Sequence, residues 1–368
     1  MSVLIFSQAV DVHATAVTWA LGRHNVETRL VCQADFPELF TASVWFDPQH
    51  RVAISEPEHD HLIGDVDVVW YRRITSLTVP EGAHPADAFG IQQQGLNFLR
   101  SLHGSSFQRA FWINSYEAHL RGINKLLQLQ VAGEVGLRIP RTLISNRPED
   151  VRAFLAQKAD AFIAKPLSPL NWHGDDYLAS AYTSHVTLAD CADDQSIQWL
   201  PMIYQGQVRK AFELRVVVMG RSIFAAKIFS QELEDATLDW RIAQERPDLR
   251  YEPYVPSDDL RRRLLNLMDR LGLVFGSIDL IVDPDGEVWF LEVNEQGQFL
   301  FVEDRLPELP LLDAFAHFCI SAKVDFVYAK TSDPATFSDF IASPTWQSDQ
   351  TARLKLHNEY TPRISERE

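Results

Sequence analysis

SIDLIVDPDGEVWFLEVNEQGQFLFVE, which runs from Ser277 to Glu303, contains the most informative pattern in this chain. Two β-rich runs, Ser277–Asp283 and Glu287–Asn294, flank the dipeptide Asp285–Gly286. An Asp-Gly pair between two such runs is a strong signal for a two-residue hairpin turn. The stretch therefore predicts a β-hairpin.

Counting outward from that turn pairs Asp279 with Glu292, and Asn294 falls on the same strand face as Glu292. Three oxygen ligands then converge in apolar surroundings, where unpaired carboxylates would be costly. An all-oxygen, partly open set suits Mg²⁺. The alternative is a surface hairpin with its acids in water. A three-residue turn with a bulge would break the predicted register.

Composition limits the class of protein. The 368 residues are 46% hydrophobic, which is enough for two or three compact units. A formal charge of −16, from 34 basic and 50 acidic residues, argues against a nucleic-acid-binding protein. Three widely spaced cysteines without a CxxC motif, and no apolar run of membrane-spanning length, predict a cytoplasmic protein with no membrane segment.

The N-terminal region predicts an α/β fold. Ser2–Ser7 and Glu27–Val31 are strand-like and flank a helix-compatible segment, Asp11–Leu21, which indicates a βαβ start. No glycine fingerprint follows the first strand, so a Rossmann dinucleotide site has no support. A further strand, Asp67–Tyr71, ends in Arg72–Arg73, which is either a solvated strand end or an anion clamp.

Longer-range patterns continue toward the C-terminus. Ser115–Leu137 and Asp258–Leu271 have the apolar periodicity of helices, and residues 168–180 form a polar, turn-rich stretch that predicts a mobile loop. After about Val324 the periodicity is lost, which predicts a loosely packed tail.

Several charged residues occupy positions that suit phosphate chemistry. Lys165 ends an apolar strand before the predicted loop, while Arg215 and Lys227 lie inside strands, where an inward-facing cation needs an anionic partner. Asp239 and Arg241 offer one acid and one forked donor. Solvated charges are the alternative for each. Serine hydrolase, zincin and P-loop motifs are absent from the sequence.

Taken in order, these residues resemble the ATP-grasp superfamily, and more narrowly the microviridin-type (graspetide) ligases that cross-link ribosomal peptides. The motifs that carry the resemblance are VWYRR (69–73), NKLLQLQVAGEVGLRIPRTLISN (124–146), IAKPL (163–167), AYTS (181–184), ELRVVVMG (213–220), DWR (239–241), LGLVFGSIDL (271–280) and FLEVNEQGQFLFVE (290–303). The resemblance implies a mixed α/β ATP-grasp fold. It places a pre-ATP-grasp domain at 1–114, a central lid at 115–201, a C-terminal ATP-grasp domain at 202–324 and a tail at 325–368.

The resemblance also implies site roles. Lys125 and Lys165 match the lysines that hold the ATP phosphates, Gln205, Gln207 and Val208 match the adenine hinge, and Glu213 sits near the ribose. Arg215 matches an arginine near the transferred phosphate, Asp239 and Arg241 match the acceptor side, and Lys227 has no clear role. Asp279, Glu292 and Asn294 match the Mg²⁺ ligands.

The implied activity is ATP-dependent activation of an Asp or Glu side chain as an acylphosphate, followed by a lactone or lactam cross-link in a precursor peptide with a leader and a core. A homodimer is expected by analogy. Two alternatives stay open: a RimK-like ligase that adds an amino acid to a protein or small acid, and a non-catalytic ATP-binding protein. Glu295-Gln296 departs from the family pattern and would add a negative charge where an acidic peptide approaches.

Overall fold

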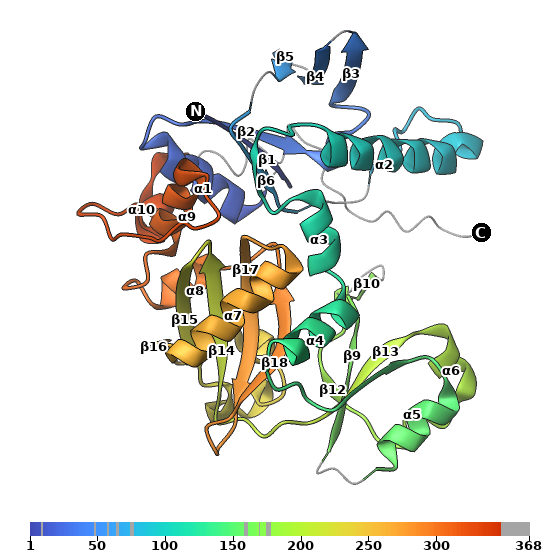
Figure 1. Cartoon of the computed structure of the whole chain (residues 1–368). Helices are drawn as coiled ribbons and strands as arrows, with labels where there is room; N and C mark the ends of the chain where they lie inside the picture. Colours follow the sequence, from blue (N-terminus) through green and yellow to red (C-terminus); the bar gives the residue numbers. More distant parts are fainter. Residues whose placement is uncertain are drawn as a thin grey trace.

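The computed structural model describes residues 1–346 except 9, 48, 57–58, 64–65, 74–76, 158–160, 169 and 174–177. Within these residues the chain forms three larger sheets and two smaller ones (Figure 1). The end of the predicted tail, from residue 347, lies outside the described residues.

The first large sheet is parallel and has the order β2-β1-β6-β7. Its strands are β1 (Ser2–Ser7), β2 (Glu27–Cys32), β6 (Val68–Tyr71) and β7 (Phe111–Ile113), with helices α1 (Val12–Gly22) and α2 (Ala88–Ser105). The predicted βαβ start is confirmed because β1 and β2 pair in parallel across α1. A separate antiparallel sheet contains β3 (Thr41–Asp47), β4 (Gln49–Glu56) and β5 (His59–Ile63).

The second large sheet has the order β12-β9-β13-β8. Its elements are β8 (Thr142–Ser145), β9 (Phe162–Pro166), β12 (Ser184–His185), β13 (Met202–Gly206), α5 (Pro148–Leu155) and α6 (Asp194–Trp199). Because β13 pairs with both β8 and β9, we propose a domain boundary after Gly206 instead of after residue 201.

Two predictions in this region are wrong in detail. The helix expected over Ser115–Leu137 is two helices, α3 (Tyr116–Gly122) and α4 (Lys125–Glu134). Asn124 starts the second helix because its side chain accepts a hydrogen bond from Leu127 N at 3.0 Å. The stretch predicted as a loop contains a hairpin of β10 (Asn171–His173) and β11 (Leu178–Ser180).

The third large sheet is antiparallel and has the order β16-β15-β14-β17-β18. Its strands are β14 (Phe212–Met219), β15 (Ser222–Ile228), β16 (Tyr251–Tyr254), β17 (Phe275–Val282) and β18 (Val288–Asn294). Helix α7 (Asp258–Leu271) covers one face together with α4, and its apolar stripe of Leu260, Leu264, Leu267, Met268 and Leu271 is buried as its periodicity predicts. Helices α8 (Leu300–Arg305) and α9 (Leu311–Ser321) pack on the opposite side.

One hydrophobic core joins the first and third sheets. It contains Val3 and Ile5 of β1, Val217 and Met219 of β14, and Phe315 of α9. Since α9 packs against α1 as well as β14, these two parts of the chain bury apolar surface together.

The tail prediction is wrong for its first part. Helix α10 (Phe337–Ala342) packs on α1 and α8, and Phe340 is fully buried with its ring centroid 5.8 Å from that of Trp19. The buried carboxylate of Glu303 accepts hydrogen bonds from Leu312 N at 2.6 Å and Phe337 N at 2.7 Å. This segment is held by contacts of a few aromatic side chains that irregular backbone separates along the chain. Such contacts give no periodic apolar pattern in the sequence.

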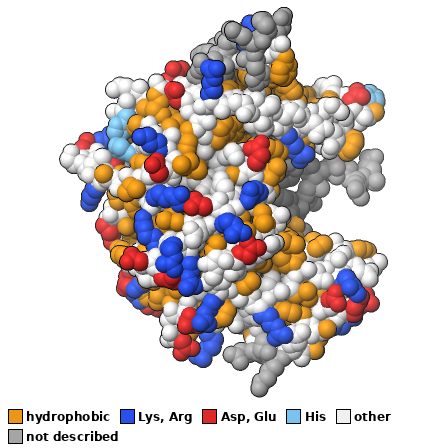
Figure 2. Space-filling model, viewed as in Figure 1, with side chains coloured by type: hydrophobic (Ala, Val, Ile, Leu, Met, Phe, Trp, Pro, Cys, Tyr) orange, Lys and Arg blue, Asp and Glu red, His pale blue; other side chains and the backbone are white. Residues whose placement is uncertain are grey.

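No helix in the described part of the chain is long and apolar enough to cross a bilayer. Figure 2 shows acidic and basic side chains interspersed on the viewed face, with several basic ones over α7. The arginines of α7 are held by neighbouring groups, as in the pairs of Arg262 and Arg263 with Asp259 and of Arg270 with Glu134.

Candidate active site

The hairpin of β17 and β18 brings the predicted acids together. Asp279 is the register partner of Glu292, which confirms the predicted pairing. The turn, however, is one residue longer than predicted. Asp283 N donates to Glu287 O at 3.0 Å, and Gly286 has a φ of +84°, so three residues, Pro284 to Gly286, form the loop.

A β-bulge compensates for the longer turn. Near the turn Leu280 pairs with Phe290, which is one residue out of the predicted register, but beyond the shift Asp279 pairs with Glu292. Leu291 is the extra residue, and the buried side chains of Phe290 and Val293, three positions apart, therefore enter the same core. The longer turn shifts the pairing by one residue and the bulge shifts it back, so Asp279 and Glu292 are paired as predicted.

Cations neutralise both acids. Arg215 Nη1 donates to Asp279 Oδ1 and Oδ2 at 2.9 and 2.8 Å, and Lys125 Nζ lies 2.6 Å from Glu292 Oε2. Asn294 Nδ2 donates to Asp279 Oδ2 at 2.9 Å. Burial raises the pKa of Asp279 against the opposing charge of Arg215. Burial also acts to raise the pKa of Glu292, but the ammonium groups of Lys125 and Lys165 outweigh it and lower that pKa to about 2.

Lys165 joins this group from the second sheet. It lies on β9, and burial lowers its pKa, with the Glu292 carboxylate opposing and the Lys125 ammonium adding to the effect. Lys125 is the first residue of α4. Two lysines from different elements therefore approach one carboxylate of the third sheet.

Asp239 and Arg241 lie at the margin of the same group. Arg241 Nε donates to Asp239 Oδ1 at 2.8 Å, and Arg241 Nη2 donates to Asp239 Oδ2 at 2.5 Å. Burial acts to raise the pKa of Asp239, but its bonds to Arg241 outweigh burial and lower that pKa. Asp239 is buried, whereas about half of the Arg241 side chain is exposed. The hydrogen bonds to Asp239 raise the pKa of Arg241, and the negative charges of Glu292 and Asp279 add a smaller increase. The exposed guanidinium is thus available to an anionic group.

The residues predicted to form the adenine hinge lie at the end of β13 and in the linker to β14. Gln205 is buried; its Nε2 donates to Thr142 Oγ1 at 2.9 Å, while its Oε1 has no hydrogen-bond partner among the described residues. Gln207 N donates to Ala161 O at 2.9 Å, and Gln207 Oε1 lies 3.0 Å from His185 Nε2. Val208 is half-buried in the same linker.

Glu213 is held inside the third sheet. It is buried, and it accepts hydrogen bonds from Lys210 Nζ at 2.9 Å and Ser230 Oγ at 2.7 Å. Burial raises its pKa against the charge of Lys210. Lys227 lies on the opposite sheet face from Arg215, since its register partner is Leu214, and its Nζ is 3.7 Å from Glu252. It does not join the other site residues.

A buried network that the sequence pattern does not predict lies behind the site. Arg72 is fully buried and forms an ion pair with Asp11, with its Nη2 3.2 Å from Asp11 Oδ1, so it is neither a solvated strand end nor an open anion clamp. Its Nη1 donates to the carbonyls of Gln296 and Gly297 at 2.7 and 3.0 Å. Arg215 Nη2 donates to the next carbonyl, Gln298 O, at 2.9 Å. A turn after β18 thus links the first sheet to Arg215.

Glu295 also differs from its prediction. Its carboxylate is buried and lies 3.0 Å from His119 Nδ1, so its charge is turned into the protein instead of toward an approaching peptide. Asn114 Nδ2 donates to Glu295 O at 2.9 Å and holds its backbone. Only the departure from the family pattern at Glu295-Gln296 pointed to this region in the sequence.

The chain is similar to solved ligases along most of its length. MdnC, a macrocyclase from Microcystis aeruginosa MRC solved with the precursor peptide MdnA, is 29% identical; the match covers 87% of this chain and 100% of that chain with a TM-score of 0.77. MdnB from the same organism is 26% identical, with 87% and 99% covered and a TM-score of 0.72. A RiPP-associated ATP-grasp ligase from Chryseobacterium gregarium, solved with ADP and a leader and core peptide, shares the fold at 24% identity, with 88% and 97% covered and a TM-score of 0.79. No family model and no curated protein matches the sequence.

These similarities and the arrangement of the three large sheets confirm the expected mixed α/β fold and the resemblance. The chain thus has the fold of a RiPP-associated ATP-grasp ligase and is similar in sequence to the macrocyclases MdnC and MdnB along most of its length.

Proposed function

We propose that this chain uses ATP to activate Asp or Glu side chains of a ribosomally made precursor peptide and joins them to hydroxyl or amine groups of the same peptide. The observation that carries the proposal is the convergence of two cation–carboxylate pairs, Arg215 with Asp279 and Lys125 with Glu292, whose acids face each other on β17 and β18. Relatives that act on precursor peptides support the choice of substrate.

The residues suit a nucleotide with Mg²⁺. Two carboxylates and the amide of Asn294 form an all-oxygen donor set, provided that the amide turns its oxygen toward the ion. Mg²⁺ held by Asp279, Glu292 and Asn294 would neutralise phosphate oxygens during transfer. In the structure Lys125 is paired with Glu292. On nucleotide binding its ammonium group would turn from Glu292 to the phosphates.

Two buried polar atoms also suit a bound nucleotide. Gln205 Oε1 and Arg215 Nε have no hydrogen-bond partner among the described residues, although buried polar atoms are normally paired. We propose that Gln205 at the end of β13, with Gln207 and Val208 in the linker that follows, receives the adenine. Glu213 would lie near the ribose, and Arg215 would stabilise the transferring phosphoryl group.

The remaining residues serve the acceptor. Lys165 would hold phosphate oxygens with Lys125. Arg241, oriented by Asp239, would bind the carboxylate that is to be phosphorylated. The oxygen of that carboxylate takes the γ-phosphoryl group, ADP leaves, and a hydroxyl or amine of the peptide then displaces phosphate to form an ester or amide. A cytoplasmic location, suggested by three widely spaced cysteines without a CxxC motif, and a homodimer are parts of the same proposal.

Coexpression with a short peptide rich in Asp, Glu, Lys, Thr and Ser, followed by mass measurement, tests the function. We expect the loss of one water for each bond formed, and no loss with Asp279→Asn. A mass gain equal to an amino-acid residue would favour the RimK-like alternative. Nucleotide binding without ADP release for every candidate peptide would favour a non-catalytic protein.

A further inference from the structure

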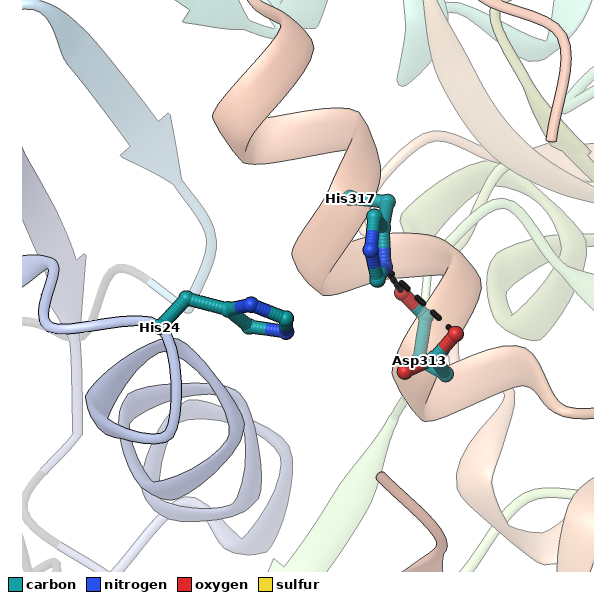
Figure 3. A group of neighbouring side chains, drawn as sticks. All are labelled: His24, Asp313 and His317. Atoms are coloured by element: carbon teal, nitrogen blue, oxygen red, sulfur yellow. Dashed lines mark hydrogen bonds and ion pairs between the residues drawn. The ribbon is translucent and has the colours of Figure 1, made fainter. Parts of the chain in front are cut away.

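Three metal-binding side chains meet away from the proposed active site (Figure 3). His24 follows the end of α1, and Asp313 and His317 lie one turn apart on α9. One potential ligand atom from each residue lies within 4.8 Å of the other two. The imidazole of His24 projects across the gap between the two helices toward the other pair in Figure 3.

The donor set differs from that of the active site. Two imidazoles and one carboxylate suit Zn²⁺ and similar transition-metal ions, whereas Mg²⁺ prefers oxygen ligands alone. Bonds of about 2.0 to 2.2 Å to such an ion place its ligand atoms closer together than 4.8 Å, so any pair near that limit would have to move inward to bind one ion. His24 is exposed and can make this movement by changing rotamer.

Asp313 is held firmly in place. Its Oδ2 accepts hydrogen bonds from Tyr328 Oη at 2.7 Å and Thr331 Oγ1 at 3.0 Å, and its Oδ1 accepts one from Ala335 N at 2.8 Å. These bonds anchor the segment after α9 even without a metal, and hydrogen-bonded carboxylates of this kind are typical of metal ligands. His317 Nδ1 is 2.9 Å from Asp313 O and 3.4 Å from Asp313 Oδ2.

The surroundings favour a structural role. The rings of His24 and His317 are already in edge-to-face contact, with centroids 4.9 Å apart. Next to His24, the guanidinium of Arg23 is paired with Asp333 at 2.6 Å, so the neighbouring positive charge is offset. An ion here would join α1 to α9 at the same place where Arg23 joins α1 to the following segment.

We propose that His24, Asp313 and His317 form a binding site for one divalent transition-metal ion, with water completing the coordination, and that the ion clips α1 to α9. Zn²⁺ is the probe for this class. The site is independent of nucleotide turnover.

Calorimetric titration of the chelator-treated full-length protein with Zn²⁺, in excess Mg²⁺, tests the proposal. We expect one Zn²⁺ per chain, and affinity reduced at least about tenfold in His24→Ala and in His317→Ala. Asp279→Asn, which alters the active-site acids, and His84→Ala, which removes a histidine elsewhere, should bind Zn²⁺ like the wild type. Since His24 is exposed, its variant should fold normally, which circular dichroism would verify.

Co²⁺ provides a second readout that does not depend on activity. Ligation by two imidazoles and a carboxylate should give visible d–d absorption in the wild type and in Asp279→Asn, and its loss in His24→Ala. The proposal is overturned if the wild type binds no Zn²⁺, if His24→Ala and His317→Ala bind as tightly as the wild type, or if Asp279→Asn abolishes binding.

Discussion

Glu303 should make the packing of α9 and α10 dependent on pH. Burial raises the pKa of this carboxyl group from 4.5 to about 7, against the hydrogen bonds from Phe337 N and Leu312 N. A folded-state pKa above the unfolded value means that the folded state binds the proton more tightly. The stabilisation is therefore complete below about pH 4.5 and is lost as the pH rises through about 7.

The magnitude follows from linkage. With pKa values of 4.5 unfolded and about 7 folded, the free energy of opening falls by about 2 kcal/mol between pH 5 and pH 7, which is roughly a 40-fold change in the opening constant. Because Glu303 is only 3% exposed, solvent screening should reduce this value little.

Hydrogen exchange measured residue by residue, or on short peptides by mass spectrometry, is the suitable assay. The amides of Leu312 and Phe337 donate directly to Glu303, so their protection factors report opening at this site. After correction for the intrinsic exchange rate, protection should fall by roughly 40-fold across this range in the wild type.

Glu303→Gln is the matched variant, since it has the same shape and cannot ionise. One of its two positions becomes an amide nitrogen, so it should lose one hydrogen bond and be less protected at pH 5, with little further change toward pH 7. Parallel pH profiles for the wild type and Glu303→Gln would refute the assignment of the effect to this carboxyl group.

Three other changes test the proposed site. Asp279→Asn or Glu292→Gln should abolish ADP release while leaving the thermal unfolding midpoint within a few degrees, and full turnover in either variant would remove the metal-ligand assignment. Asp11→Asn should leave the guanidinium of Arg72 buried without its charge partner and lower the free energy of unfolding by about 3 to 5 kcal/mol, measured by urea titration; a loss under about 1 kcal/mol would contradict this reading. Lys165→Arg should shift the alkaline limit of ATP affinity to higher pH, because burial lowers the lysine pKa from 10.5; unchanged pH profiles in titrations with a fluorescent nucleotide would argue against a phosphate contact.

The fold could be predicted well where the pattern is local and periodic. The βαβ start and the amphipathic helix α7 were both predicted from apolar spacing and are confirmed. The pairing of Asp279 with Glu292 was also predicted, but for an incomplete reason, because the longer turn and the bulge at Leu291 compensate for each other. A period-two count cannot detect an extra residue in either place.

The remainder depended on contacts between residues far apart in the sequence. Arg72 and Asp11 each look like ordinary surface charges when read alone, and only the fold buries them together. Glu295 could be noticed as a departure from a family pattern, but its partner His119 lies 176 residues earlier in the chain. Helix α10 was missed because its packing relies on a few aromatic side chains instead of a repeating stripe.

The turn after β18 bears on how such ligases can be recombined. Three successive carbonyls, at Gln296, Gly297 and Gln298, receive guanidinium groups from Arg72 and Arg215. A chimera that exchanged the N-terminal unit would need to supply an arginine at the position of Arg72, together with an acid at the position of Asp11. Without that pair, the donated half would leave the carbonyls of Gln296 and Gly297, next to the one that Arg215 binds, without their guanidinium donor. Compatibility between donor halves should therefore be judged on these two positions before any residue that touches substrate is considered.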